Sequence, residues 1–262
     1  MSETQQKSFI LETKHLKKVY NAHTDNAFEA LHNIDFQVEP GEFVAIMGPS
    51  GSGKSTFINN ISTIDTPTSG TVWINGKDTR TMSANEIGRF RYQNLGFIFQ
   101  DFNLLDTHTM YENIAMPLAL AHVKQKDIRP RVEELARDMQ IEELLNKHPN
   151  ECSGGQRQRG AICRALVNHP HIIVADEPTG NLDSANSAEL LEILQNLNQK
   201  DGVTIIMVTH DPLIASYSSR LIVIRDGRIE SEIRRNNLSQ NDYFTKIEEI
   251  NSEESREILK KG

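Results

Sequence analysis

The sequence has few cysteines, one tryptophan and no long apolar run. Its 262 residues include only two cysteines, Cys152 and Cys163, too few for the disulfide framework of a small secreted domain and suited to a reducing interior. The longest apolar stretch, Ile114 to Ala121, is interrupted by Pro117 and is far shorter than the ~20 residues that a membrane-spanning helix needs. The opening stretch MSETQQKSFI contains no apolar signal core. We therefore expect no direct insertion into a membrane.

Net positive charge is also absent. Lysine and arginine total 28 against 36 aspartate and glutamate, which gives a net charge of −8. This balance argues against a general binder of nucleic acid or of anionic membranes. Hydrophobic residues make up 37% and charged residues 24%, a composition that can bury a core. The length favours one domain, or one core with a smaller inserted subdomain.

Short apolar runs alternate with helical patterns along the chain. The predicted strands lie within residues 9–37 and at 43–47, 71–74, 95–99, 172–175 and 204–208, with a hairpin at 221–229. Strands separated by helices predict a parallel α/β sheet. From about 101 to 167 the pattern is helical without a strand, with Asp127 as a helix cap and Pro130 in the first turn, which predicts an inserted helical subdomain. The tail after Arg234 is charged and helix-prone, and we expect it to be solvated.

A glycine-rich segment between a predicted strand and a predicted helix fits the phosphate-binding pattern G-x-x-x-x-G-K-[ST]. Glycines allow a sharp turn that brings backbone N–H groups onto phosphate oxygens, and the following helix directs its positive end at the same anion. Lys54 is expected to reach the β- and γ-phosphates, and Ser55 to offer a hydroxyl to Mg²⁺. The predicted phosphate loop is Gly48, Pro49, Ser50, Gly51, Ser52, Gly53, Lys54, Ser55 and Thr56.

Two carboxylates end a second apolar run. Asp176 and Glu177 follow Ile172–Ala175, at the strand edge where open α/β sheets bind ligands. We expect Asp176 to hold Mg²⁺, directly or through water, and Glu177 to polarise an attacking water as a general base. Pro178 predicts an extended Glu177 and no continuing helix. Together with the phosphate loop, the pair indicates nucleotide hydrolysis.

Further motifs resemble those of ABC ATPases. The segment Cys152-Ser153-Gly154-Gly155-Gln156 is similar to the family's LSGGQ signature, with a cysteine in place of the usual leucine or isoleucine. Other motifs appear in the family's order: a Q-loop at Gln100, a D-loop at Asn181-Leu182-Asp183 and a switch histidine at His210. The resemblance covers roughly residues 9–234. It implies an α/β fold with a RecA-like P-loop core (about 9–100 and 168–234), an antiparallel β subdomain, an inserted helical subdomain (about 101–167) and a charged tail (235–262).

The resemblance also implies an assembly and roles for single residues. Two chains would pair head to tail as a homodimer, each signature (Ser153, Gly154, Gly155 and Gln156) covering ATP on the other chain's phosphate loop. His210 would contact the γ-phosphate and position water, and Gln100 would sense Mg²⁺ and water; taken alone, both are ordinary polar residues. Asp183 would act across the dimer. Tyr20 would stack on adenine, with Phe28 as an alternative.

Longer stretches narrow the resemblance. Residues 176–184, DEPTGNLDS, are similar to lipoprotein-releasing and macrolide-efflux ATPases, and residues 96–109 and 207–220 resemble the Bce-type subgroup, which confers resistance to bacitracin, nisin and other peptide antibiotics. We therefore expect an ATPase subunit that powers a permease in exporting or detaching antimicrobial peptides. It would lie peripherally on the cytoplasmic side of the membrane, with Phe102, Leu104 and Leu105 docking the permease unless they are internal core.

Alternative functions keep the ATPase but change its partner. One is a regulatory ATPase coupled to a membrane protein in signalling or cell-wall control, and another is a lipoprotein- or macrolide-type transporter. A soluble ABC protein of DNA repair or translation fits poorly, because the chain has neither a long coiled-coil insertion nor a second set of motifs. We expect no nucleic-acid partner.

Overall fold

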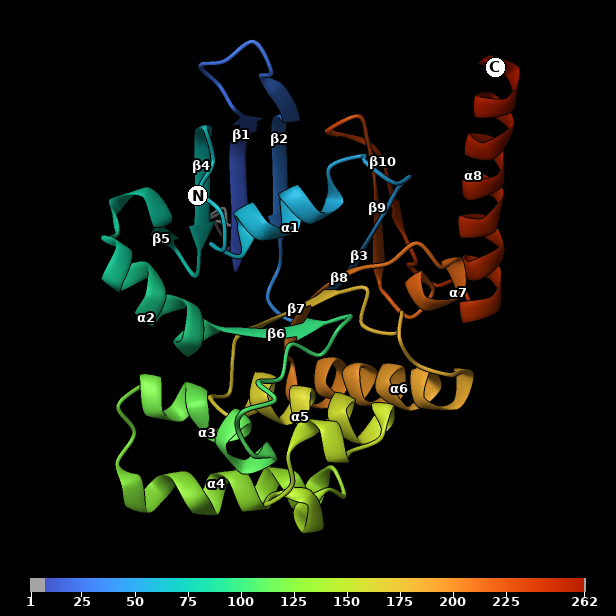
Figure 1. The fold of residues 1–262 in the computed structure, drawn as a ribbon. Coiled ribbons are helices and arrows are strands. Elements are labelled where there is room, and N and C mark those ends of the chain that lie inside the picture. Colours follow the sequence, from blue (N-terminus) through green and yellow to red (C-terminus); the bar gives the residue numbers. More distant parts are fainter. Residues whose placement is uncertain (1–7, 262) are drawn as a thin grey trace, which may run out of the picture. The chain divides into compact units, whose positions relative to one another are not determined.

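The computed structural model describes residues 8–261, with side chains up to Ser252, and divides the chain into two compact units. The first unit runs to Asp78 and resumes at Ile206, and the second is Thr79–Ile205. Figure 1 shows the elements of both units. The helical subdomain expected at about 101–167 falls within the second unit, and its bounds remain a prediction.

The first unit contains an antiparallel sheet with the strand order β2-β1-β4-β5. Along the second half of β2 buried and exposed residues alternate, so Ile34, Phe36 and Val38 line one face. β1 and β2 pair from Leu11 opposite Val38 to Tyr20 opposite Phe28. The strands predicted within residues 9–37 and at 71–74 are thereby confirmed as β1 (Leu11–Tyr20), β2 (Phe28–Val38) and β4 (Ser69–Ile74), to which β5 (Lys77–Asp78) is added.

A second set of strands in the first unit leads into the phosphate loop. β3 (Phe43–Met47) is buried at every position and pairs in parallel with β9 (Arg220–Arg225), which forms a hairpin with β10 (Arg228–Arg234). The order here is β10-β9-β3-β8, and the unit boundary falls within β8 (Thr204–Val208). A continuous apolar run is typical of a parallel strand covered on both faces, which explains why β3 could be predicted. The loop after β3 opens helix α1 (Lys54–Ile61).

The charged tail is anchored on one face. Helix α8 (Gln240–Lys261) buries Tyr243 and Ile247 in a cluster with Met47, Ala215 and other apolar residues of the first unit. It also contacts the short helix α7 (Pro212–Ala215). Burying a side chain such as Ile247 contributes about 1.5–3 kcal/mol, so the solvation expected from its charges describes only the outer face.

In the second unit β6 (Leu95–Phe99) and β7 (Ile172–Asp176) pair in parallel, from Leu95 opposite Ile172 to Phe99 opposite Asp176. Residues 79–94 carry no predicted element, yet α2 (Ala84–Asn94) forms there. Its signal is a capping box, in which Ser83 accepts from the Glu86 N–H and Glu86 accepts from the Ser83 N–H. The unit also contains α6 (Ser184–Asp201) and short 3-10 helices at Thr79–Thr81, Glu142–Leu144 and Pro149–Glu151.

Three helices of the second unit share one apolar cluster. They are α3 (Met110–Leu120), α4 (Gln125–Asp138) and α5 (Gly154–Leu166), drawn in light green to yellow in Figure 1. The predicted cap of α4 is wrong, because the helix begins earlier, with Lys124 at the N-cap. Asp127 already donates its N–H to the Lys124 carbonyl at 2.8 Å and lies in the first turn, where the helix dipole favours a carboxylate.

Among residues 8–261, no helix combines the length and the apolar character that a membrane crossing requires.

Candidate functional site

The phosphate loop depends on glycine at two crowded positions. Gly48 has φ 147°, and a Cβ there would lie 2.0 Å from the Ile224 carbonyl oxygen. Gly53 has φ 100° at the N-cap of α1, and a Cβ would lie 2.7 Å from the Ala30 carbonyl oxygen. The N-cap residue Gly53 has no side chain that could cap α1. The first N–H groups of a helix lack partners within the helix itself. The helix start is therefore suited to bind an anion.

The side chains of the loop fit the same ligand. The Lys54 ammonium donates to the carbonyls of Gly48 and Pro49, both at 2.9 Å, which folds it over the loop. Ser52 is 3% exposed, and its Oγ has no hydrogen-bond partner within the described residues. A buried hydroxyl without a partner costs free energy, and a phosphate oxygen would relieve that cost. Ser50 and Ser55 are exposed at the loop surface.

Two more predicted residues lie in the first unit. The Thr209 N–H donates to the Ile46 carbonyl at 3.1 Å, which places the exposed His210 just beyond the end of β3, next to the start of the phosphate loop. Tyr20 ends β1 with 37% of its surface exposed, opposite Phe28 with 59%. Both aromatic rings are accessible to a ligand.

The acidic residues and the Q-loop residue come together in the second unit. Because Phe99 pairs with Asp176, Gln100 follows β6 at the level where Glu177 follows β7. The predicted extended conformation of Glu177 is wrong: its φ is 46°, and a turn closes with the Gly180 N–H donating to its carbonyl at 3.1 Å. The turn imposes the left-handed backbone that Pro178 alone did not indicate. Such strain in a non-glycine residue is typical of functional sites.

The D-loop is tied directly to the Q-loop. Asn181 Nδ2 donates to the Gln100 carbonyl at 3.1 Å and to Asp101 Oδ1 at 2.7 Å. A Cβ on Gly180 would lie 2.8 Å from Gln100 Nε2, so the glutamine side chain packs against that glycine. Sequence reasoning assigned Asn181 no role, since no local pattern marks a contact across this separation.

The signature begins helix α5 with a capping box. Ser153 Oγ accepts from the Gln156 N–H at 3.3 Å, and Gln156 Oε1 accepts from the Ser153 N–H at 2.9 Å. Gly154 and Gly155 form the first turn, and a Cβ on Gly155 would lie 2.4 Å from Asn186 Oδ1. The box leaves the N–H groups of both glycines at an exposed helix start.

Asp183 has a structural role within its own chain. Its carboxylate caps α6 and accepts from the backbone and side-chain N–H groups of Asn186 at 2.9 and 2.8 Å. These bonds, the backbone one above all, lower the pKa of the Asp183 carboxyl, which is ionised at neutral pH. The predicted role across a dimer remains a prediction.

Two arginines of α5, Arg157 and Arg164, hold the segment after the Q-loop. Arg164 donates to the carbonyls of Phe102 and Asn103, whose φ values are 61° and 50°. Burial lowers the pKa of Arg164 to about 10, so it remains charged at neutral pH. The Arg157 guanidinium lies over the Phe102 ring at 5.4 Å, and Arg159 forms an ion pair with Glu189 at 2.6 Å.

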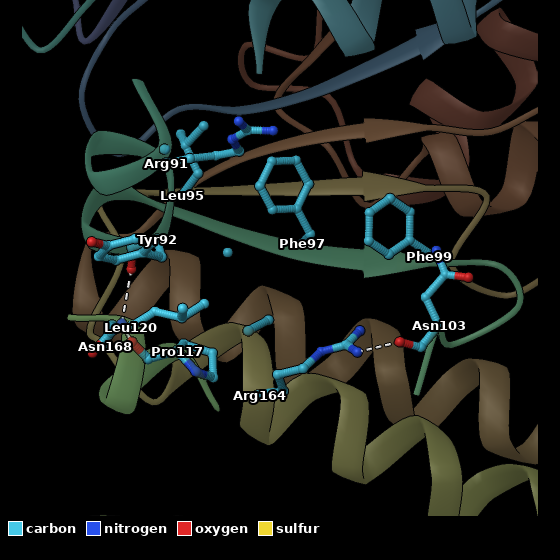
Figure 2. A pocket seen from close by; sticks show the side chains of 13 residues that line it. Arg91, Tyr92, Leu95, Phe97, Phe99, Asn103, Pro117, Leu120, Arg164 and Asn168 are labelled. Carbon is cyan, nitrogen blue, oxygen red and sulfur yellow. Dashed lines mark hydrogen bonds between the residues drawn. The ribbon is translucent and has the colours of Figure 1, made fainter. Parts of the chain in front are cut away.

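A groove of about 490 Å³ opens beside this segment, between β6, α2, α3 and α5. Figure 2 shows the rings of Phe97 and Phe99 along β6, and Pro117, Leu120 and Arg164 on the other side. The two rings are stacked, with their centroids 5.7 Å apart. Leu120 is 52% exposed. The groove therefore offers an apolar surface edged by positive charge.

The docking residues expected from sequence are largely internal. Phe102 is 6% exposed, and Leu104 packs against the helical cluster, so the core interpretation holds for both. Leu105 is 44% exposed. Cys152 is likewise a packing residue: it is buried in the same cluster, and burial raises the pKa of its thiol.

The predicted metal ligands Ser55, Gln100 and Asp176 supply hydroxyl, amide and carboxylate oxygens, the donors that Mg²⁺ prefers. Within the described residues, no three histidine, cysteine or acidic side chains form a metal cluster. Ser55 belongs to the first unit and the other two to the second, so their joint action on one ion is a proposal.

A strand that ends in a glycine-rich anion cradle before a helix defines a P-loop nucleotide-binding protein. Residues 31–180 match the family described as "ABC transporter". The chain is 50% identical over 226 residues to the ABC transporter ATP-binding protein YxdL of Bacillus subtilis (86% of this chain, 87% of the relative). It is 45% identical over 238 residues to the bacitracin export ATP-binding protein BceA of Halalkalibacterium halodurans (91% and 94%).

A solved structure shares the fold. The dimeric, post-hydrolysis ATP-binding cassette MJ0796 of Methanocaldococcus jannaschii, bound to ADP and phosphate, matches with a TM-score of 0.80 and 39% identity, over 87% of this chain and all of that one. The chain therefore belongs to the ABC transporter family. It is the ATP-binding subunit of an ABC transporter and an ATPase, and the predicted fold class is confirmed.

Proposed function

We propose that this subunit powers a membrane permease that exports or detaches antimicrobial peptides of the bacitracin and nisin kind. The similarity to BceA, which extends over 91% of the chain, is the observation that supports this substrate class. The protein would act at the cytoplasmic face of the membrane, held there by the permease. ATP binding and hydrolysis would supply the two states that the permease needs.

The ATP-bound state in this proposal is a head-to-tail homodimer. The phosphate loop of one chain and the exposed start of α5 in its partner, Ser153 to Gln156, would bind the same triphosphate. Two observations support it: the backbone N–H groups at both helix starts, and the dimeric state of the MJ0796 cassette. Because a γ-phosphate held by both chains favours the closed state, its hydrolysis would release the partner.

Each predicted residue then has a task in hydrolysis. Glu177 would accept a proton from the attacking water, and His210 would hold the γ-phosphate and orient that water. Gln100, whose carbonyl accepts a hydrogen bond from Asn181, would sense Mg²⁺ and water and report to the helical subdomain. Asp183 would act across the dimer. Mg²⁺ near Ser55, Gln100 and Asp176 would neutralise phosphate charge.

The permease would contact the groove in Figure 2 with a short helix. The stacked rings of Phe97 and Phe99 and the exposed Leu120 suit the apolar face of such a helix, and Arg91 at the edge suits an acidic residue near its end. The groove also borders Asn103, close in sequence to Gln100. A permease helix seated there would be positioned to sense the Q-loop.

Co-purification with the permease encoded by the neighbouring gene tests this function. We expect bacitracin or nisin to raise the ATPase rate of the complex, with no effect of a macrolide or a lipoprotein. Stimulation by a macrolide or a lipoprotein alone would favour the alternative transporter types. ATPase activity that no substrate changes would favour a regulatory ATPase.

A pair of surface variants tests the docking groove. Leu120→Glu places a charge in the groove and should reduce recovery of the permease. Leu213→Glu is the matched control, because Leu213 is almost equally exposed at 53% but belongs to α7 and does not line the groove. Equal recovery with both variants would contradict the groove assignment.

A further inference from the structure

The end of β1 is tied to the segment that follows the phosphate-loop helix. The Tyr20 hydroxyl donates to Asp65 Oδ2 at 3.1 Å, and the Lys18 ammonium donates to Asp65 Oδ1 at 2.6 Å. The Asp65 N–H in turn donates to the carbonyl of Asn59 in α1 at 3.0 Å. The tyrosine ring is thus connected through one carboxylate to the helix that begins at the phosphate loop.

The carboxylate is held on several sides. The Thr66 N–H also donates to Asp65 Oδ1, at 2.7 Å. Burial alone raises the pKa of the Asp65 carboxyl, but the hydrogen bonds from Lys18, Thr66 and Tyr20 outweigh it, so the pKa lies below its ordinary value. Asp65 is therefore ionised at neutral pH and is a strong acceptor for the tyrosine hydroxyl.

Lys18 contacts one face of the same ring. Its ammonium lies 5.0 Å from the Tyr20 centroid and donates to the Thr66 carbonyl at 2.8 Å. Its side chain is only 12% exposed, so it is fixed rather than mobile in solvent. A cation over one face of the ring leaves the opposite face for a ligand.

The segment that carries Asp65 is bonded along β1. The Thr68 N–H donates to the Lys17 carbonyl at 2.9 Å, and the Val19 N–H donates to Thr68 Oγ1 at 2.9 Å. These bonds hold the segment that carries Asp65 alongside the end of β1. Phe28, directly opposite on β2, has a hydrocarbon ring that cannot accept or donate such a bond.

We infer that Asp65 and Lys18 are positioning residues for nucleotide binding: they fix Tyr20 so that the base stacks on the ring face opposite the ammonium. The inference depends on the stacking of Tyr20 on adenine, which the resemblance to ABC ATPases implies. Stacking tolerates any base with a flat face, so the device contributes affinity rather than a choice of base. Fixing the ring beforehand reduces the ordering that binding must otherwise impose.

Calorimetric titration of the whole protein with ADP and with pyrophosphate separates the base from the phosphates, and neither ligand is hydrolysed. Tyr20→Ala should weaken ADP binding by roughly 5- to 150-fold and leave pyrophosphate binding unchanged. Tyr20→Phe and Asp65→Ala should each weaken ADP binding by roughly 3- to 10-fold, again without change for pyrophosphate. Both substitutions remove the hydrogen bond between Tyr20 and Asp65. The double variant Tyr20→Phe/Asp65→Ala should therefore lose no more ADP affinity than Asp65→Ala alone.

Two controls frame these measurements. Asp35→Ala removes an exposed aspartate that is also bonded to β1, through the His15 N–H at 2.6 Å, and should leave ADP binding unchanged. Lys54→Ala should weaken the binding of both ADP and pyrophosphate, because the lysine is expected to bind the phosphates. Unchanged pyrophosphate binding in each Tyr20 or Asp65 variant shows that the phosphate loop is still folded.

The outcomes distinguish the positioning role of Asp65 from the stacking role of Tyr20. If Tyr20→Ala weakens ADP binding but Tyr20→Phe and Asp65→Ala do not, the positioning role is overturned and the stacking role stands. If Phe28→Ala weakens ADP binding and Tyr20→Ala does not, the adenine assignment itself is wrong. A loss of pyrophosphate binding in Asp65→Ala would also overturn the inference, because the effect would then be on the phosphate loop.

Discussion

Ser52→Ala should stabilise the nucleotide-free protein and weaken nucleotide binding. Ser52 is 3% exposed, and its hydroxyl has no hydrogen-bond partner within the described residues, although it lies in the phosphate loop. Leaving a buried hydroxyl unpaired costs about 1–3 kcal/mol, a cost that alanine removes. When a phosphate binds, the serine gains a bond to a charged oxygen worth about 1.5–3 kcal/mol, which alanine cannot make. The two effects therefore have opposite signs.

The matched control is Ser62→Ala. Ser62 is the C-cap of α1, the helix that follows the phosphate loop. Ser62 is fully buried like Ser52, but its Oγ donates to the Ile58 carbonyl at 2.6 Å. Removing a satisfied bond should lower the free energy of unfolding by about 0.5–1.5 kcal/mol. The same substitution in the same unit is thus expected to destabilise at one position and stabilise at the other.

Urea unfolding without nucleotide, followed by calorimetric titration with ADP, measures both quantities. We expect a higher free energy of unfolding for Ser52→Ala and an ADP affinity lower by roughly 10- to 100-fold. A Ser52→Ala protein that is less stable than the wild type and binds ADP equally well would refute the assignment. In that case the Ser52 hydroxyl has a hydrogen-bond partner inside the folded protein and forms no hydrogen bond with the ligand.

Two further predictions concern catalysis and the cysteines. Glu177→Gln removes the proposed base and should slow ATP turnover, measured by phosphate release, by about two orders of magnitude or more. ATP-dependent dimerisation should persist, which size-exclusion chromatography with light scattering checks; a monomer in ATP would contradict the head-to-tail dimer. Burial raises the pKa of the Cys163 thiol from 9.0 to about 12, so its reaction with a thiol reagent at neutral pH should be slower than in the urea-unfolded chain by on the order of a thousandfold. Cys152, also buried and with a raised pKa, should be slowed less; fast labelling of either thiol in the folded protein would contradict the packing role.

Much of the core could be predicted because its signals are local. The apolar run Phe43–Met47 and the glycine pattern after it identify β3 and the start of α1 within a short window. The run before Asp176 identifies β7 in the same way. Helix α2 also had a local signal, the capping box of Ser83 and Glu86, which the sequence analysis did not use.

Other features depend on residues far apart in the chain. Asp65 and Lys18 are separated by 47 positions, and Arg164 reaches the carbonyl of Phe102 across 62. The turn at Glu177 also had no local indication, since the proline after it favoured an extended backbone. No periodicity or spacing rule reports such contacts.

The sequence by itself determined the class of protein and the identity of its nucleotide motifs, because phosphate binding needs particular residue types at fixed short spacings. Only the tertiary structure decided which polar groups are paired. In the tertiary structure the buried Ser52 hydroxyl has no hydrogen-bond partner within the described residues, and the buried Phe102 ring lies under Arg157. Tyr243 packs α8 against the first unit, and Tyr20 is hydrogen-bonded to Asp65. Burial and pairing arise from the packing of distant segments, and a local pattern contains no information about which segments those are.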